Sequence, residues 1–157
     1  MLKAERIIEL REEAARHEHP EEMLVDVMHE AQDAYGYLSD EAVGVVAGII
    51  GVSAQRVDQL ATFYNLFYRR PVGRRVIHVC DSISCWAMGA DDIVSYLKRK
   101  LGIEMGGTSA DGAFTLLPIV CLGACHEAPA MMVGEIIYGN LTPEKIDRIL
   151  EKEKNNN

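Results

Sequence analysis

Apolar residues recur at helical spacing through residues 1–70. One stripe comprises Ile7, Ile8, Leu10 and Ala14, and a second, in "EEMLVDVMHEAQDAY", comprises Met23, Leu24, Val27, Met28, Ala31 and Ala34. Steps of three and four residues place such side chains on one face of an α-helix. The pattern therefore predicts amphipathic helices in this part of the chain.

Helix-breaking and helix-capping residues divide this region into four predicted helices. Pro20 separates the first two, because proline lacks a backbone N–H group. Gly36 and Gly51 are placed to end the second and third helices, and Ser39 and Ser53 to cap the third and fourth. The fourth helix is expected to continue through "ATFYNLFY" and to pack on the second half of the chain through Phe63, Tyr64, Phe67 and Tyr68.

After residue 70 the pattern changes to short apolar runs that predict β-strands. "RVIHVC" (75–80) alternates along its length and is rich in β-branched residues, as buried strands are. "GAFTLLPIVC" (112–121) predicts a second strand, in which Pro118 indicates an edge or a bulge. "PAMMV" and "IIYG", joined by a turn at Gly134 and Glu135, predict a hairpin.

Two helices are predicted among these strands. "SCWAMGADDIVSYLKRKLG" (84–102) is predicted as one helix, whose buried side comprises Trp86, Ile93, Tyr96, Leu97 and Leu101. Thr142 as N-cap and Pro143 as first helical residue begin the last helix. The sequence thus predicts a mixed α/β (α+β) fold, with an N-terminal helical bundle over residues 1–70 and a small mixed sheet, covered by helices, over residues 71–157.

The charge of the chain narrows the choice of partners. Lys and Arg number 16 against 24 Asp and Glu, which gives a formal net charge of -8. Nucleic-acid binding needs a basic surface, so nucleic acid is not an expected partner. The beginning of the chain mixes charged and apolar residues, unlike a signal peptide, and "AVGVVAGIIGV" is too short to span a bilayer. We therefore expect a cytoplasmic protein without direct membrane insertion, bound peripherally to the cytoplasmic side of a membrane only through a complex.

The four cysteines form two local pairs, Cys80-x4-Cys85 and Cys121-x3-Cys125. Cytoplasmic thiols stay reduced, so the pairs indicate metal binding rather than disulfides. The pairs follow the first two predicted strands, and the carboxyl ends of neighbouring strands meet at one edge of a sheet. Four thiolates are the ligand set of one tetrahedral zinc ion or one 2Fe-2S cluster. The alternative to a metal site is that the four cysteines are unrelated buried residues that bind nothing, since free cysteine often serves only as a small apolar side chain.

The surroundings of the cysteines favour a cluster over zinc. Structural zinc sites commonly use C-x2-C knuckles in small domains that have little hydrophobic core. This chain has enough apolar residues to fold without a metal ion that stabilises its structure. Gly123 and Ala124 leave room for inorganic sulfides, and Cys85 at a helix start directs backbone N–H groups toward the site. We expect each close pair of cysteines to hold one iron of the cluster.

Three stretches carry a resemblance to a known family. "GYLSDEAVGVVAGIIGVSAQRVDQLATFYNLFYRRPVG", "HVCDSISCWAMGADDI" and "VCLGACHEAPAMMV" together resemble the small 2Fe-2S subunit of the NADH-oxidising module of respiratory NADH:quinone oxidoreductase (complex I). The resemblance extends from about residue 20 to residue 150. It implies a helical extension followed by a thioredoxin-like 2Fe-2S ferredoxin domain, with all four cysteines as ligands of one cluster. His126, beside the last of them, is expected to be a surface or neighbouring residue and not a ligand.

The same resemblance implies an electron-transfer subunit that carries out no hydride transfer of its own. A larger partner subunit would bind NADH and FMN, and the cluster would exchange single electrons with that FMN. The sequence itself contains no G-x-G-x-x-G after a strand and no P-loop. It also lacks the C-x-x-C motif of thiol oxidoreductases.

Two alternatives to this function stay open at the level of sequence. The first is the equivalent subunit of an NAD-linked or electron-bifurcating hydrogenase, or of an NAD-dependent formate dehydrogenase. The second belongs to another class, a zinc-stabilised interaction module without redox activity.

A basic stretch, comprising Arg69, Arg70, Arg74 and Arg75, lies between the two predicted halves of this acidic chain. It has two interpretations. It is either a solvated linker, in which the charges contribute little, or a docking patch for an acidic surface of the flavin-bearing subunit.

Overall fold

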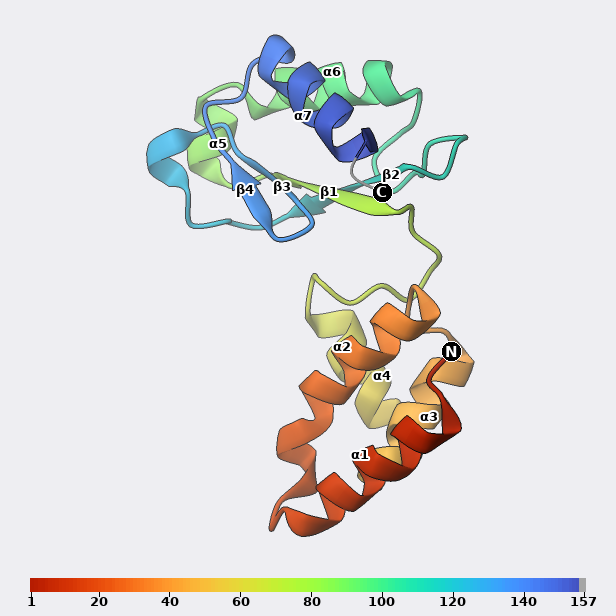
Figure 1. Cartoon of the computed structure of the whole chain (residues 1–157). Helices are drawn as coiled ribbons and strands as arrows, with labels where there is room; N and C mark the ends of the chain where they lie inside the picture. The colour runs from red at the N-terminus through yellow and green to blue at the C-terminus, as the bar shows by residue number, and fades with distance from the viewer. Residues whose placement is uncertain (156–157) are drawn as a thin grey trace. The chain divides into compact units, whose positions relative to one another are not determined.

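The computed structural model describes residues 1–155 and divides the chain into two compact units, Met1–Pro71 and Val72–Asn157 (Figure 1). The first is entirely helical and the second contains the sheet. None of the helices within residues 1–155 combines the length and apolar character needed to cross a membrane.

The helical unit contains four α-helices and one short 3-10 helix. Their bounds are α1 Ala4–Arg16, η1 Pro20–Met23, α2 Leu24–Tyr35, α3 Asp40–Ile50 and α4 Ala54–Phe63. Ile8, which the sequence places in the first apolar stripe, is instead 57% exposed, so this part of the prediction is wrong. Leu10, Leu24, Val27 and Met28 of the two predicted stripes are all buried in the interior. They join buried residues of α3 and α4 in one core, so the unit has an interior of its own.

The predicted capping residues occupy the helix ends. Gly36 and Gly51 end α2 and α3 with φ of 81° and 83°, in the left-handed region that glycine adopts without strain. The hydroxyl of Ser39 accepts a hydrogen bond from the Ala42 backbone N–H at 3.1 Å, and that of Ser53 caps α4 in the same way. These four predictions are confirmed.

Ser39→Ala is expected to lower the free energy of unfolding by about 1 kcal/mol, because a helix N–H group of α3 loses its acceptor. Denaturant unfolding followed by far-ultraviolet circular dichroism measures this change. Ser39→Asp, which keeps a capping oxygen, is the matched control and should retain most of the stability. Equal stability of the alanine variant and the natural protein would contradict a capping role for Ser39.

The fourth helix is shorter than the sequence predicts. α4 ends at Phe63, and the backbone of Tyr64 is extended. The side chain of Gln32 causes this departure, since its amide donates to Leu66 O at 2.8 Å and accepts from Tyr68 N–H at 2.7 Å. These bonds hold the segment in a non-helical path and satisfy its backbone groups.

The aromatic residues of this segment consequently do not form one helical surface. Phe67 is buried in the core of the helical unit itself, with its ring centroid 4.5 Å from that of His29. Phe63 and Tyr64 are exposed. The expectation of a four-residue helical seam is therefore wrong.

The second unit is built on a four-stranded sheet in the order β2-β1-β3-β4. The strands are β1 Arg75–Cys80, β2 Phe114–Ile119, β3 Met131–Val133 and β4 Ile136–Tyr138. β1 runs parallel to β2 and antiparallel to β3, and β3 and β4 form the predicted hairpin. Pro118 lies in β2 at the edge of the sheet, as the sequence indicates.

Helices α6 (Ala90–Leu101) and α7 (Pro143–Asn155) cover one face of this sheet (Figure 1). Alternate residues of β1, Ile77 and Val79, point into the core between sheet and helices. Leu116 of β2, Leu97 of α6 and Ile146 of α7 contribute to the same core, and all three are fully buried. The second unit thus has its own core, formed by the strands and helices that the sequence predicts.

The helix predicted over residues 84–102 is two helices. α5 covers Ile83–Ala87, and α6 begins at Ala90 after Gly89, whose φ is 90°. A residue in that conformation interrupts the helix, and glycine adopts it without steric cost. Trp86 therefore does not share the buried stripe of α6, and its side chain is 58% exposed. The prediction that it belongs to the core is wrong.

Two arginines of the basic stretch form ion pairs within their own units. Arg69 pairs with Asp40 at 2.8 Å and Asp58 at 2.7 Å, and Arg75 pairs with the buried Glu153 at 3.2 Å. These contacts give both arginines a structural role. The docking interpretation then rests on Arg70 and Arg74, which are exposed.

Candidate metal centre

The sheet brings the two cysteine pairs to the same edge. Cys80 is the last residue of β1, and Cys85 lies in the short helix α5 that follows. Cys121 comes two residues after the end of β2, and Cys125 begins the 3-10 helix η2, Cys125–Glu127. Because β1 and β2 are parallel neighbours with Cys80 opposite Ile119, both pairs leave the sheet at its carboxyl edge.

The sulfur atoms of Cys121 and Cys125 lie 3.6 Å apart. Two thiolates bound to one tetrahedral metal, each at about 2.3 Å, are separated by about 3.8 Å. This pair thus has the spacing needed to hold a single iron. Cys80 and Cys85, the other pair, lie in one small buried cluster. Both Cys80 and Cys125 act electrostatically on the Cys85 thiol, so Cys85 connects the two pairs.

The space around the sulfurs is lined by small residues. Ala90, Ala128 and Ala130 form a small buried cluster with Cys80 and Cys85. The Gly123 N–H donates to the Cys121 sulfur at 3.3 Å, and Gly123 has a φ of 77° that a side chain would disfavour. Small side chains and backbone donors suit the sulfides and thiolates of a 2Fe-2S cluster. Within residues 1–155, no set of three or more His, Cys, Asp or Glu side chains has the geometry of a single-ion site.

The two pairs differ in exposure. Cys80 and Cys85 are each 2% exposed, whereas Cys121 and Cys125 lie at the surface. Burial, followed by the hydrogen bond with Cys80, raises the pKa of Cys85 to about 11. The Gly123 N–H, followed by the hydrogen bond with Cys125, lowers the pKa of Cys121. The site therefore has an enclosed side and a side that faces solvent.

In the metal-free protein, iodoacetamide is expected to modify Cys121 and Cys125 well before Cys80 and Cys85. The reagent reaches the exposed sulfurs freely, and the thiolate form that reacts is favoured at Cys121 and disfavoured at Cys85. Because the pKa of Cys85 is raised to about 11, its reactivity should keep rising above pH 9, after that of Cys121 has levelled off. Peptide mass spectrometry over a time course at several pH values checks both statements. Equal rates at the four positions would contradict this arrangement.

Two residues near the sulfurs were not predicted from the sequence. Ser82 is near enough to Cys121 to contribute to lowering the pKa of its thiol, and Ala130 O accepts from Cys80 N–H at 3.1 Å. Ser82 lies between the first two cysteines, a position that could have indicated its role, whereas Ala130 comes close only through the sheet. His126 is exposed, with Nε2 3.8 Å from a Glu127 carboxylate oxygen. This position agrees with the surface role expected for it.

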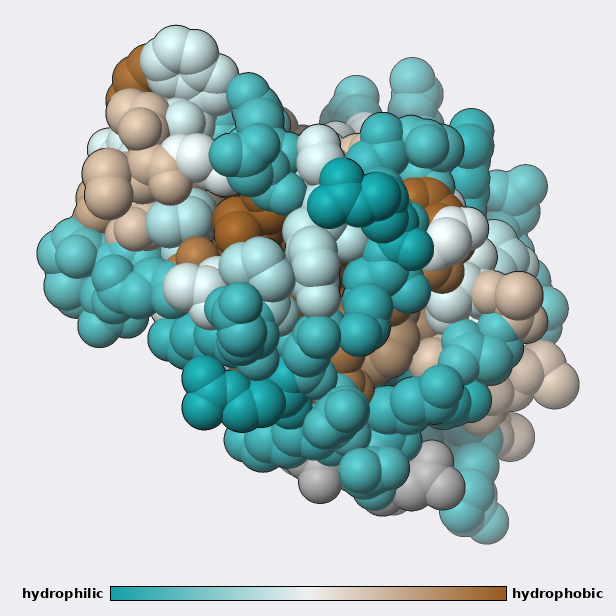
Figure 2. All heavy atoms as spheres, turned by 90° about the horizontal axis from the view of Figure 1, so that it is seen from above, coloured by the Kyte–Doolittle hydropathy of each residue, from teal (hydrophilic) through white to brown (hydrophobic). Residues whose placement is uncertain are grey.

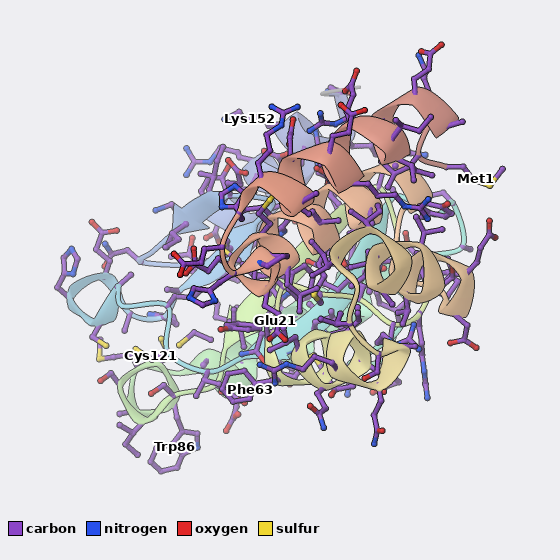
Figure 3. The ribbon with its side chains drawn as sticks, turned by 90° about the horizontal axis from the view of Figure 1, so that it is seen from below. Met1, Glu21, Phe63, Trp86, Cys121 and Lys152 are labelled. Carbon is purple, nitrogen blue, oxygen red and sulfur yellow. The ribbon has the colours of Figure 1, made fainter. Side chains whose placement is uncertain are left out.

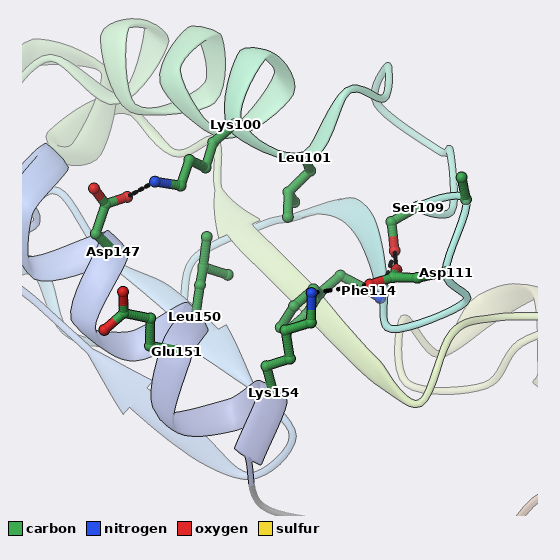
Figure 4. A pocket seen from close by; sticks show the side chains of 10 residues that line it. Lys100, Leu101, Ser109, Asp111, Phe114, Asp147, Leu150, Glu151 and Lys154 are labelled. Atoms are coloured by element: carbon green, nitrogen blue, oxygen red, sulfur yellow. Dashed lines mark hydrogen bonds and ion pairs between the residues drawn. The ribbon is translucent and has the colours of Figure 1, made fainter.

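A cavity of about 430 Å³ lies elsewhere in the second unit (Figure 4). It opens between the last turns of α6 and α7 and the segment before β2, over an apolar floor that includes Phe114 and Leu150. Ion pairs border it, with Lys100 2.9 Å from Asp147 and Lys154 3.3 Å from Asp111. The cavity adjoins the start of β2, whereas Cys121 follows the end of that strand, so it is separate from the cysteine site.

A small mixed sheet with two converging cysteine pairs at its carboxyl edge defines a domain that binds metal through thiolates. Comparison with known proteins identifies the family of this domain: residues 10–154 match the thioredoxin-like 2Fe-2S ferredoxin family. The chain belongs to this family, and the predicted resemblance and fold class are confirmed.

Curated relatives extend the similarity to nearly the whole chain. A subunit of the NADH-quinone oxidoreductase of Escherichia coli strain K12 is 40% identical over 142 residues, which are 90% of this chain and 86% of the relative. The corresponding NADH-quinone oxidoreductase subunit from Pseudomonas aeruginosa is 37% identical over 139 residues, or 88% and 84% of the two chains.

A solved structure shares the fold. The likeness to an NAD+-reducing NiFe hydrogenase in the H2-reduced state has a TM-score of 0.70 and 21% sequence identity. It covers 83% of this chain and 22% of the hydrogenase chain.

Proposed function

We propose that this chain is the electron-transfer subunit of an NADH:quinone oxidoreductase and that it holds one 2Fe-2S cluster on Cys80, Cys85, Cys121 and Cys125. The convergence of the two cysteine pairs at one sheet edge, in a member of a 2Fe-2S family, carries this proposal. Such a cluster accepts and returns one electron at a time. We further infer that Cys80 and Cys85 bind one iron and Cys121 and Cys125 the other.

The residues around the sulfurs have distinct tasks in this proposal. Ala128 and Ala130 keep bulky groups and water away from the enclosed pair, which preserves a low-dielectric surrounding. The Gly123 N–H donates to the Cys121 sulfur and, with a smaller contribution from the nearby Ser82, stabilises negative charge on it. Together these groups set the charge balance on which a reduction potential depends.

The proposed partner is a larger subunit that binds NADH and FMN, and the cluster exchanges single electrons with that FMN. Hydride transfer then takes place on the partner, and this chain has no autonomous site for it. The names of the relatives support assembly in a multi-subunit NADH dehydrogenase. We propose a cytoplasmic location, peripheral to the membrane and reached through the complex.

The alternatives have less support. The hydrogenase likeness, at 21% identity, is one of fold, whereas the quinone oxidoreductase relatives reach 40% identity over most of the chain. Membership of a 2Fe-2S family also opposes the zinc module. The quinone oxidoreductase is therefore the function that we propose.

Electron paramagnetic resonance on the chain, alone and co-expressed with the flavin-bearing subunit, tests this function. NADH should produce an S = 1/2 signal from this chain in the complex within the mixing time and should leave the isolated chain oxidised. Dithionite should reduce both. A signal that NADH elicits from the isolated chain, or a loaded complex that NADH leaves silent, would overturn the proposal.

A further inference from the structure

Large apolar side chains surround the cysteine site at the protein surface. Ile83 is 72% exposed, Trp86 58%, Met88 62% and Val120 64%. The first three belong to α5 and its C-cap, and Val120 directly precedes Cys121. We call these four residues the apolar rim.

The members of the apolar rim occupy one surface. Ile83 and Trp86 are three residues apart in α5 and share a face of that helix, while Cys85 is its one buried residue. The Asp81 N–H donates to Ile119 O at 3.0 Å, which ties the segment before α5 to the segment that carries Val120. In Figure 3, Trp86 and Cys121 lie at the same corner of the molecule. Figure 2 shows tan and brown side chains gathered over α5, beside mostly hydrophilic helices.

Single exposed apolar residues are ordinary on soluble proteins, whereas a contiguous group around a chemical site indicates an interaction surface. Tryptophan is moreover the residue type most enriched among those that dominate binding energy. The exposed pair, Cys121 and Cys125, lies beside this group. A protein seated on the apolar rim would thus cover the solvent-facing side of the cysteine site.

The charges beside the apolar rim are all of one sign. Asp81 precedes α5, Asp91 and Asp92 occupy the first turn of α6, and Glu127 lies in η2 with Cys125. The sequence has no Lys or Arg from residue 76 to 97 or from residue 101 to 144. The basic residues of α6, from Lys98 to Lys100, are at its opposite end. The border of the apolar rim is therefore acidic.

We propose that the apolar rim and its acidic border form the docking surface for the electron-exchanging partner subunit, whose facing surface is apolar at its centre and bordered by Lys or Arg. Charge complementarity favours this occupant over a second copy of the chain, because two copies would bring acidic borders together. The proposal rests on the proposed function and names the surface through which it operates. It differs from the basic-stretch hypothesis in both location and sign of charge.

The test measures binding of the full chain, loaded with its cluster, to the purified flavin-bearing subunit of the same complex. Trp86→Ala and Val120→Ser should each weaken binding about tenfold or more, as expected for central interface residues. Ile136→Ala is the matched control, since Ile136 is 49% exposed but lies in β4, at the opposite edge of the sheet from β2. It should bind like the natural protein.

The role of the acidic border is tested separately, by the rate of association and its dependence on salt. Asp91→Asn combined with Asp92→Asn should slow association and flatten its dependence on salt, because steering by opposite charges is screened by ions. A double variant that associates with unchanged rate and salt dependence would overturn the charge complementarity.

Visible absorbance of the cluster, recorded for every variant, separates this proposal from the proposed function. Weak binding with an intact cluster supports the docking surface. Unchanged binding of both rim variants overturns it, as does a natural chain that dimerises through the apolar rim in sedimentation experiments. A natural chain without a cluster would instead contradict the proposed function. If Trp86→Ala loses the cluster, the binding of Val120→Ser tests the docking surface instead, because Val120 lies outside α5, directly before Cys121.

Discussion

Cys85→Ala is expected to yield a colourless chain that retains almost none of the iron bound by the natural protein. Cys85 is buried, so water or an external thiol cannot readily take the place of its sulfur. One iron would be left with an incomplete ligand set, because 2Fe-2S clusters of this kind are held by four cysteine thiolates. Iron analysis and visible absorbance of the purified variant measure the loss.

Ser84→Ala is the matched control for this change, because Ser84 lies in the same short helix beside Cys85. It should keep the full iron content. A Cys85→Ala chain with the natural iron content and absorbance would show that Cys85 is not a ligand.

Leu116→Ala is expected to lower the free energy of unfolding of the second unit by about 2–5 kcal/mol, the range for deleting most of a buried leucine side chain. Leu116 is fully buried, between the sheet and the helices that cover it, and lies opposite Ile77 in the register of β1 and β2. The substitution leaves a cavity that neighbouring side chains only partly fill. Amide hydrogen exchange of β1 and β2, read by mass spectrometry, reports this loss for the second unit alone.

Leu117→Ala provides the comparison, since Leu117 is the next residue of the same strand and only half-buried. Its loss should be clearly smaller than that of Leu116→Ala. Equal losses at the two positions would contradict the assignment of strand faces on which the core depends.

Local signals account for most of what the sequence predicts correctly. A capping serine such as Ser39 or a terminating glycine such as Gly51 acts on its own helix end, so neither depends on the rest of the fold. The β-branched run of β1 likewise predicts a buried strand, and residues 76–80 are buried on both faces of the sheet. The placement of both cysteine pairs at one edge of the sheet was predictable because each pair is local and follows a strand.

The errors arise where distant parts of the chain decide the local conformation. Gln32 of α2 holds the backbone at Leu66 and Tyr68, and no pattern near those residues reveals it. Helical periodicity continues across Gly89, although its backbone turns there and separates Trp86 from α6. The unequal exposure of the two cysteine pairs also depends on tertiary packing, which spacing does not encode.

Joint analysis of iron, acid-labile sulfide and zinc, in the chain purified without oxygen, tests whether the two cysteine pairs hold a single di-iron centre. We expect two iron ions and two sulfides per chain, no zinc, and an S = 1/2 signal on reduction with dithionite. One zinc ion per chain without sulfide, in a preparation that stays silent on reduction, would contradict this expectation.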